Sequence, residues 1–130
     1  MKKIDKKIVL SASILGAITI AIGAFGAHGL EKLVDSESIV TFETAVRYQM
    51  YHAFLLLLVA NFALSEKTKK VLLILLILGI ILFSGSIYGL ATNALTAFDF
   101  KKIALLTPIG GTLFIVSWLI LLIQFLKSKR

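Results

Sequence analysis

The residues best suited to chemistry form one segment, Phe42 to His52, with the sequence FETAVRYQMYH. Glu43 and Arg47 are four residues apart with the acid first, the order that favours an ion pair on one helix face. Tyr48 and His52 are also four apart and share a face. The candidate ligand-binding pocket is formed by residues of this segment together with His28 from the end of the first apolar run. Its members are His28, Glu43, Arg47, Tyr48, Gln49 and His52.

Three interpretations of these residues stay open. In the first interpretation they form a ligand-binding or proton-transfer site. In the second, the pair of Glu43 and Arg47 anchors an interfacial helix, and the tyrosines belong to the aromatic belt at the membrane surface. A haem held by His28 and His52, or a transition metal held with Glu43, would need both histidines at matching depth. Because a hydrogen-bonded histidine is the commoner arrangement, we expect no metal and no cofactor.

Motifs of catalysis are missing. The chain has no His-Glu-x-x-His, no phosphate-binding glycine loop and no Gly-x-Ser-x-Gly elbow. With no cysteine it has no thiolate nucleophile and no disulfide. We therefore expect no catalytic residues and no enzyme.

The elements that position the candidate residues follow from hydropathy. The 130 residues are 58% hydrophobic and only 16% charged, which excludes a soluble globule, a secreted disulfide scaffold and a disordered tail. Long charge-free stretches reach the roughly 20 residues that a membrane-spanning helix needs. We predict one all-α integral membrane domain over residues 1–130, a four-transmembrane-helix bundle with spans near 8–30, 48–65, 71–92 and 103–126.

The loop between the first two predicted spans has helical periodicity over residues 36–47, with Ser36 as a plausible N-cap. We expect a short interfacial helix there that runs into the second span without a clean break.

Positive charge predicts the orientation. Ten of the fourteen Lys and Arg residues lie at the N-terminus, in the second loop or at the C-terminus, Arg130 included. The positive-inside rule therefore places both termini of a multi-pass cell-membrane protein in the cytoplasm. The net charge of +7 fits anionic lipid better than nucleic acid, because the basic residues flank apolar runs.

Packing in lipid depends on small residues that let helices approach closely. Pro108 is expected near the start of its helix, where a missing N–H costs little. Membrane lipids are the expected partners, with a second copy or another membrane protein as a further possibility. The predicted helix-packing positions are Gly16, Gly23, Gly26, Gly85, Gly89, Pro108, Gly110 and Gly111.

Four blocks of the sequence resemble a known family: GAFGAHGL at 23–30, TFETAVRYQMYHA at 41–53, FSGSIY at 83–88 and TPIGG at 107–111. They are similar to domain-of-unknown-function family 423, small bacterial inner-membrane proteins related to the transmembrane protein 256 group. The resemblance implies a four-span membrane protein whose site, if it has one, contains the motif residues. It brings no established catalytic residue.

The function expected from these observations is that of a non-enzymatic integral membrane protein. It would support envelope integrity or regulate a membrane partner. The alternative is binding or transport of a small molecule, lipid or ion through an outward-facing polar pocket at the helix ends, with haem or metal binding as a third hypothesis.

Overall fold

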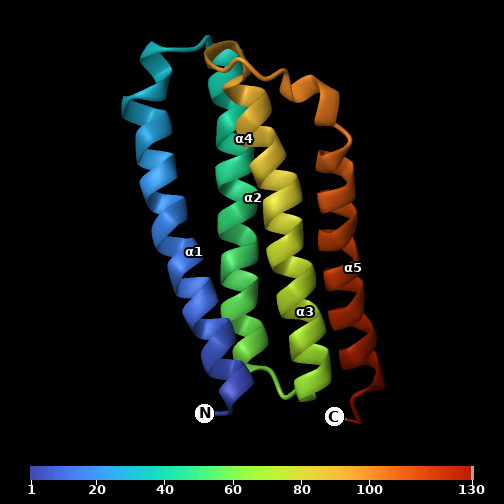
Figure 1. Cartoon of the computed structure of the whole chain (residues 1–130). Coiled ribbons are helices and arrows are strands. Elements are labelled where there is room, and N and C mark those ends of the chain that lie inside the picture. The colour runs from blue at the N-terminus through green and yellow to red at the C-terminus, as the bar shows by residue number, and fades with distance from the viewer. Residues whose placement is uncertain (130) are drawn as a thin grey trace.

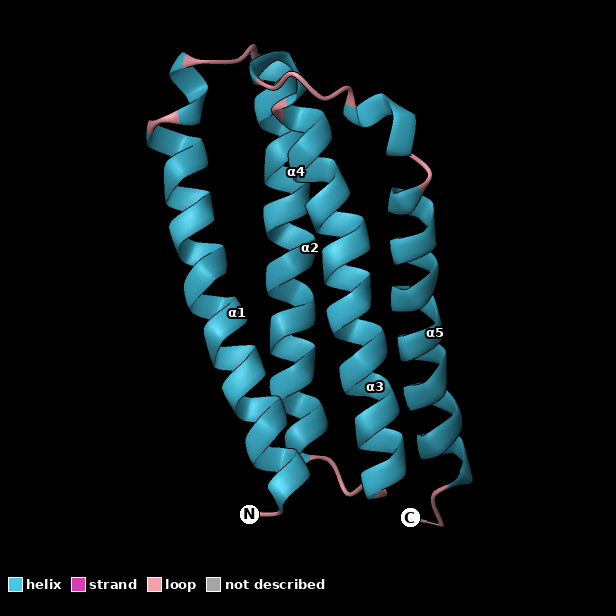
Figure 2. Cartoon of the chain, in the orientation of Figure 1, coloured by secondary structure: helices cyan, strands magenta, loops and turns pink. Residues whose placement is uncertain are grey.

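Four helical rods lie side by side in the computed structural model, which describes residues 1–129 (Figure 1). The first two are α1 (Lys3–His28) and α2 (Ser36–Asn61). The third is continuous through α3 (Glu66–Gly79), the π-helix η2 (Ile80–Ser84) and α4 (Gly85–Ala91), and the fourth is α5 (Leu106–Lys127). The described part of the chain has no strand (Figure 2), and its two ends lie at the same end of the bundle. The predicted all-α class is confirmed.

Three of the four rods are long and apolar enough to cross a membrane: residues 3–32, 66–91 and 100–127. The remaining rod, α2, contains Glu37, Glu43 and Arg47 in its first half. The part of α2 without charged residues runs only from residue 48 to residue 61. Hydropathy alone therefore does not identify α2 as a membrane-spanning helix.

The start of α2 differs from the sequence prediction. Its N-cap is Asp35, whose side chain accepts a hydrogen bond of 2.8 Å from the backbone N–H of Ser38, so Ser36 is already the first helical residue. The predicted helix over residues 36–47 is present and continues without a break into the segment that follows, as expected, but it is not a separate short element. These residues are the first turns of one unbroken 26-residue helix, because nothing between Arg47 and Tyr48 interrupts its backbone bonding.

The connections are short and well bonded. The 3-10 turn η1 (Leu30–Lys32) lies between α1 and α2, and the residues 62–65 join α2 to α3. Residues 92–105 contain the 3-10 turns η3 (Asn93–Leu95) and η4 (Phe100–Ile103). Within this segment the side-chain oxygen of Asn93 accepts a 2.8 Å bond from the N–H of Phe100, which closes the loop over the end of α4.

The interior has two apolar clusters with a polar layer between them. The cluster near the termini includes Ile8, Leu56 and Leu76, and the cluster at the other end is centred on Leu30 and Phe42. In the region between them, buried and half-buried polar side chains from α2, η2, α4 and α5 lie among buried apolar residues such as Ala53 and Ile87. We call this region the polar layer; its members are Gln49, His52, Ser84, Ser86, Tyr88 and Thr107, of which Tyr88 and Thr107 are half-buried.

Two helices approach each other closely at Gly110. A Cβ at this position would lie 2.3 Å from the backbone nitrogen of Phe83, in the π-helical turn η2. A second glycine, Gly79, makes room for the ring of Phe114, which a Cβ there would meet at 2.6 Å. Two glycines therefore bring α5 against the third rod, and Gly79 was not among the residues singled out from the sequence.

The other glycines of the sequence prediction fall into three groups, according to what a Cβ at each position would meet. A Cβ at Gly26 would meet the ring of Phe42 at 2.7 Å, and one at Gly89 would meet Phe100 at 2.4 Å. A Cβ at Gly23 would lie 3.4 Å from Val46 and one at Gly111 would lie 3.5 Å from Phe83, which are ordinary van der Waals distances. Pro108 lies in the first turn of α5, where its missing N–H has no helical partner to lose. Open space surrounds Gly16 and Gly85, so neither is a close-packing position within this chain.

Candidate functional site

The polar layer is centred on His52, which is only 4% exposed. Its Nδ1 lies 2.7 Å from the backbone carbonyl of Tyr48, one turn earlier in α2. Its Nε2 lies 3.3 Å from Nε1 of Trp118 in α5, and the indole N–H can only donate. Nδ1 must then carry the proton and donate to the carbonyl, while Nε2 accepts from Trp118. Both nitrogens of a neutral imidazole are thereby used inside the chain.

The imidazole ring is also held from one side by an aromatic ring. Phe114 stacks on His52 with ring centroids 3.5 Å apart and an interplanar angle of 6°. Gly79 leaves the space into which Phe114 fits. One turn of α5 thus supplies both the stacking ring and the indole donor four residues later, as helical spacing requires.

Three further hydrogen bonds join neighbouring rods across the polar layer. The phenol of Tyr88 donates to Oε1 of Gln49 at 2.7 Å, and the hydroxyl of Ser84 donates to the carbonyl of Ala45 at 2.8 Å. The hydroxyl of Ser86 contacts that of Thr107, at the start of α5. Because lipid-embedded helices gain little from apolar burial, such bonds and close packing are what hold them together.

Every buried side-chain nitrogen and oxygen in the described residues has a hydrogen-bond partner. A binding pocket normally holds polar groups whose partner is the ligand. Here the buried polar groups of the layer bond either one another or the backbone and side chains of neighbouring helices, so the arrangement connects α2, the third rod and α5.

The predicted outward pocket is not assembled. Among residues 1–129 the ion pairs join Lys2 to Glu66 and Lys69 to Asp5, and Glu43 and Arg47 form none. Arg47 instead donates to the hydroxyl of Thr44 at 3.2 Å, and both Glu43 and Arg47 are exposed. The sequence left open whether Glu43 and Arg47 pair with each other; in this structure they do not, because the guanidinium folds back along its own helix.

Tyr48 and Gln49 point to different surroundings although they are neighbours in sequence. Tyr48 is 39% exposed and lies against Phe83, with ring centroids 4.9 Å apart. Gln49 is buried and bonded to Tyr88. Of the six candidate residues, only Gln49 and His52 belong to the polar layer.

The two histidines do not share a site. His28 is exposed at the end of α1, and Gly26 in that last turn contacts Phe42. His52 is ten residues further along α2 than Phe42, which is roughly 15 Å along the helix axis. The histidines thus lie at different depths, unlike the matched depth that a shared haem would need. No group of three His, Asp or Glu side chains suitable for a metal ion occurs in residues 1–129.

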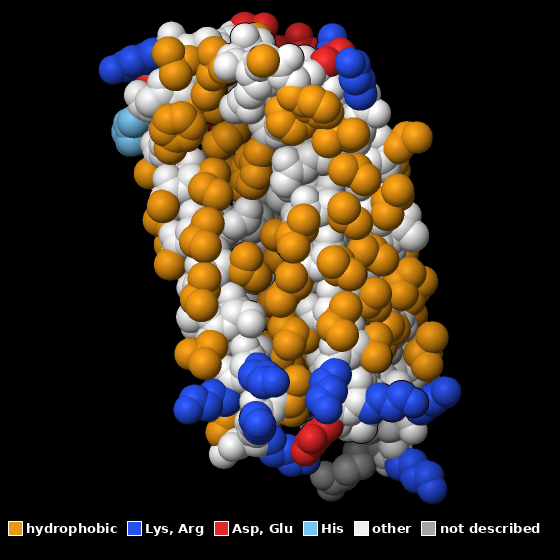
Figure 3. All heavy atoms as spheres, viewed as in Figure 1, with side chains coloured by type: hydrophobic (Ala, Val, Ile, Leu, Met, Phe, Trp, Pro, Cys, Tyr) orange, Lys and Arg blue, Asp and Glu red, His pale blue; other side chains and the backbone are white. Residues whose placement is uncertain are grey.

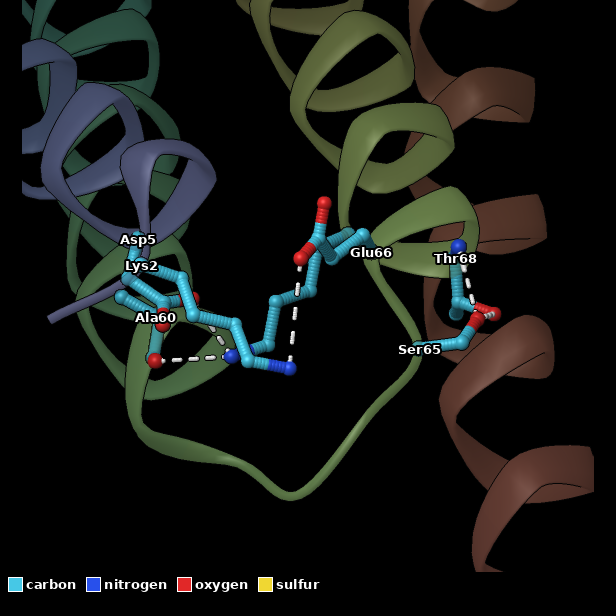
Figure 4. A network of polar contacts seen from close by, with 7 residues as sticks. Lys2, Asp5, Ala60, Ser65, Glu66 and Thr68 are labelled. Carbon is cyan, nitrogen blue, oxygen red and sulfur yellow. Dashed lines mark hydrogen bonds and ion pairs between the residues drawn. The ribbon is translucent and has the colours of Figure 1, made fainter.

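A second buried polar group lies at the end of the bundle that carries the termini, and the sequence analysis did not single it out. Nζ of Lys69 in α3 donates to Oδ1 of Asp5 in α1 at 2.6 Å and to the carbonyl of Ala60 in α2 at 2.9 Å. The side chain of Lys69 is 7% exposed and that of Asp5 is 14% exposed. Figure 4 shows these bonds beside the contact between Lys2 and Glu66, 3.9 Å apart. One ammonium group thereby connects three helices.

A weak signal for this pair exists in the sequence. Asp5 is the one acidic residue in the first thirty, and it lies among four lysines directly before the first apolar run. An isolated acid in that position suggests a specific partner. Its partner cannot be chosen from spacing alone, because Lys69 is 64 residues away and has Lys67 and Lys70 as equivalent neighbours.

An all-helical bundle with three apolar rods and an interior held by hydrogen bonds between helices has the architecture of helical membrane proteins. The family described as "Protein of unknown function (DUF423)" matches residues 22–111, and the chain belongs to that family.

Several relatives are similar along nearly the whole chain. A UPF0382 membrane protein of Haemophilus influenzae is 37% identical, with 95% of this chain and 96% of the relative covered. The UPF0382 membrane protein YwdK of Bacillus subtilis is 33% identical, with 94% and 98% covered. The UPF0382 inner membrane protein YgdD of Escherichia coli is 34% identical, with 94% and 91% covered. No solved structure matches the chain.

Proposed function

We propose that this protein is a non-enzymatic integral membrane protein whose four rods all cross the cell membrane, with both termini in the cytoplasm, and that it supports the integrity of that membrane. The observation that carries the proposal is the polar layer: its buried groups have hydrogen-bond partners within the chain and join neighbouring helices, which suits a structural role. The Escherichia coli relative is named as an inner membrane protein, in keeping with the same location here.

The position of α2 favours a fourth span despite its charges. It contacts α1, α3 and α4 and runs alongside these rods through the bundle (Figure 1). Its 26 residues correspond to about 39 Å, enough for a hydrocarbon core of about 30 Å. Gly23 of α1 contacts Val46, so the exposed Arg47 lies little more than one turn from the outer end of α1. A side chain of that length reaches the interface from there.

The charge distribution favours the orientation. Figure 3 shows most of the basic side chains gathered around the end that carries the termini, whereas the opposite end carries several acidic side chains beside a few basic ones. Of the thirteen Lys and Arg residues among residues 1–129, nine belong to the terminal end; Arg130 lies outside the described residues. The positive-inside rule assigns that end to the cytoplasm.

Deleting the gene tests the role. The deletion strain should show raised permeability and slower growth under detergent, acid and antimicrobial-peptide challenge, and the intact gene should restore both. His28→Ala and Arg47→Ala change exposed residues outside the polar layer and should restore them fully. Unchanged growth and permeability in the deletion strain would contradict the role. Loss of complementation by either variant at normal protein level would favour a ligand site at the outer end.

A further inference from the structure

A basic pocket lies between the starts of α1 and α3, at the end of the bundle that carries the termini. It has a volume of about 180 Å³ and is lined by Lys3, Ile4, Lys7, Glu66 and Lys70. The buried side chain of Ile4 contributes an apolar wall. The pocket thus joins an apolar surface to charged groups from two helices far apart in sequence.

The charge of the pocket is in excess. Three ammonium groups face one carboxylate, and that carboxylate, Glu66, is 3.9 Å from a fourth lysine, Lys2, outside the pocket. Within the described residues, Lys3, Lys7 and Lys70 make no ion pair. An anion of small size would find three donors there without displacing an existing partner.

Helix stability does not account for these lysines. Lys3 is the first residue of α1, and Lys7 and Lys70 lie at the start of the second turn of α1 and α3, so all three are near the positive ends of the two helix dipoles. Cations at these positions cost a helix stability, whereas an anion there is stabilised. The dipoles and the ammonium groups therefore act on the pocket with the same sign.

The depth of the pocket matches that of lipid phosphates. Lys7 comes directly before the charge-free run 8–30, and Lys70 directly before the run 71–98. Above them, exposed apolar side chains continue along both helices: Leu10 and Ile14 on α1, and Ile74 on α3. A molecule with an anionic head and hydrocarbon tails would place its phosphate among the lysines and its tails along these side chains.

We propose that the pocket of Lys3, Lys7 and Lys70 binds the phosphate headgroup of an anionic phospholipid. The inference rests on the membrane embedding in the proposed function and names the lipid class that this end of the protein engages. It adds a ligand site distinct from the polar layer and from the buried pair of Lys69 and Asp5.

Binding is measured on the full-length protein in detergent, by native mass spectrometry with phosphatidylglycerol or phosphatidylcholine added. The intact protein should retain phosphatidylglycerol preferentially. Changing Lys3, Lys7 and Lys70 together to Gln should weaken its retention at least tenfold. The matched control changes Lys67, Lys127 and Lys129 to Gln, which removes the same charge from the same end but outside the pocket. Equal losses in both triple variants, or equal retention of the two lipids by the intact protein, would overturn the site.

Two further measurements complete the test. Glu66→Gln removes the pocket's carboxylate and should strengthen phosphatidylglycerol retention about fivefold, a gain that a folding defect cannot produce; unchanged or weaker retention would count against the site. Glycerol phosphate without tails should compete poorly, and competition at equal concentration would reassign the site to free phosphates. Lipid retention and the deletion phenotype are read independently, so failure of the site and failure of the proposed function can be told apart.

Discussion

Trp118 donates its indole N–H to Nε2 of His52 at 3.3 Å, joining α5 to α2 through a histidine whose other nitrogen is bonded to the carbonyl of Tyr48. This relationship decides how the histidine is to be understood. An imidazole available to a metal, a proton path or a ligand needs one free nitrogen, and here both are engaged within the chain. His52 is therefore best described as a connector between helices.

Replacing Trp118 with Phe should lower the free energy of unfolding by about 1 kcal/mol, because Nε2 of His52 loses its donor. Unfolding in mixed detergent micelles provides the measurement. In a His52→Phe background the same change should cost almost nothing, since the indole has no acceptor left there. Equal costs in the two backgrounds would show that the hydrogen bond contributes nothing.

Gly110→Ala should destabilise the bundle by about 1–3 kcal/mol, because its Cβ would meet the backbone of Phe83 at 2.3 Å. Backbone atoms cannot move aside as a flexible side chain can. Thermal unfolding of the purified protein is the readout.

Two neighbouring glycines are matched controls for this variant. Gly111→Ala places its Cβ at an ordinary 3.5 Å from the ring of Phe83, and Gly85→Ala meets open space. Alanine also favours a helix over glycine by up to about 1 kcal/mol, so both controls should be neutral or stabilising. If Gly110→Ala behaves like them, the close crossing of α5 and η2 is not present in solution.

Asp5→Ala should lower the melting temperature clearly more than Lys2→Ala does. The first change leaves the ammonium of Lys69 buried with only the carbonyl of Ala60, whereas Lys2 is 66% exposed and its partner lies 3.9 Å away. Removing both charges with Asp5→Leu and Lys69→Met should recover part of the loss, because an unpaired buried charge costs more than no charge. A double variant less stable than either single one would contradict this reasoning.

The Asp35 carboxylate caps α2, and hydrogen bonding from Ser38, through its side chain and its backbone N–H, holds the pKa of Asp35 below its usual value. A carboxylate whose pKa is lowered by folding stabilises the folded state fully when the pH is above its unfolded pKa, near 3.8. This stabilisation is lost as the pH falls through the lower pKa of the folded state. Asparagine caps a helix without titrating.

Melting temperatures of the intact protein and of Asp35→Asn should therefore differ most at neutral pH and converge below about pH 4. Other carboxylates titrate in both proteins alike, so the difference isolates Asp35. A difference that stays constant from pH 7 to pH 3 would show that the cap does not depend on charge.

The sequence was sufficient for the number of helical rods and for most of their bounds, although α2 begins twelve residues before its predicted span. Charge-free runs bounded by charged residues predict the rods. Gly26, Gly89 and Gly110 could be proposed as contact positions because small residues have one dominant use between helices in lipid. The same reasoning selected Gly16 and Gly85, which face open space, because residue type does not reveal how a helix is rotated.

The polar contacts depended on tertiary geometry. Glu43 and Arg47 have favourable spacing, yet the guanidinium bonds Thr44, since an exposed pair gains little over solvent. Trp118 lies 66 residues from His52, and Lys69 lies 64 from Asp5. Pairs at such separations are fixed by how rods cross, which no local periodicity encodes. The π-helical turn η2, which brings Phe83 to Gly110, likewise has no signal in its residues.

Accessibility of single introduced cysteines tests the central claim, that α2 and the other three rods all cross the membrane with the termini inside. The natural chain has no cysteine, so Leu33→Cys, Ala63→Cys and Ala97→Cys report one connection each without background. In intact cells an impermeant thiol reagent should label Leu33→Cys and Ala97→Cys, and it should label Ala63→Cys only after the membrane is opened. Labelling of Ala63→Cys in intact cells, or protection of Leu33→Cys, would contradict the proposed topology.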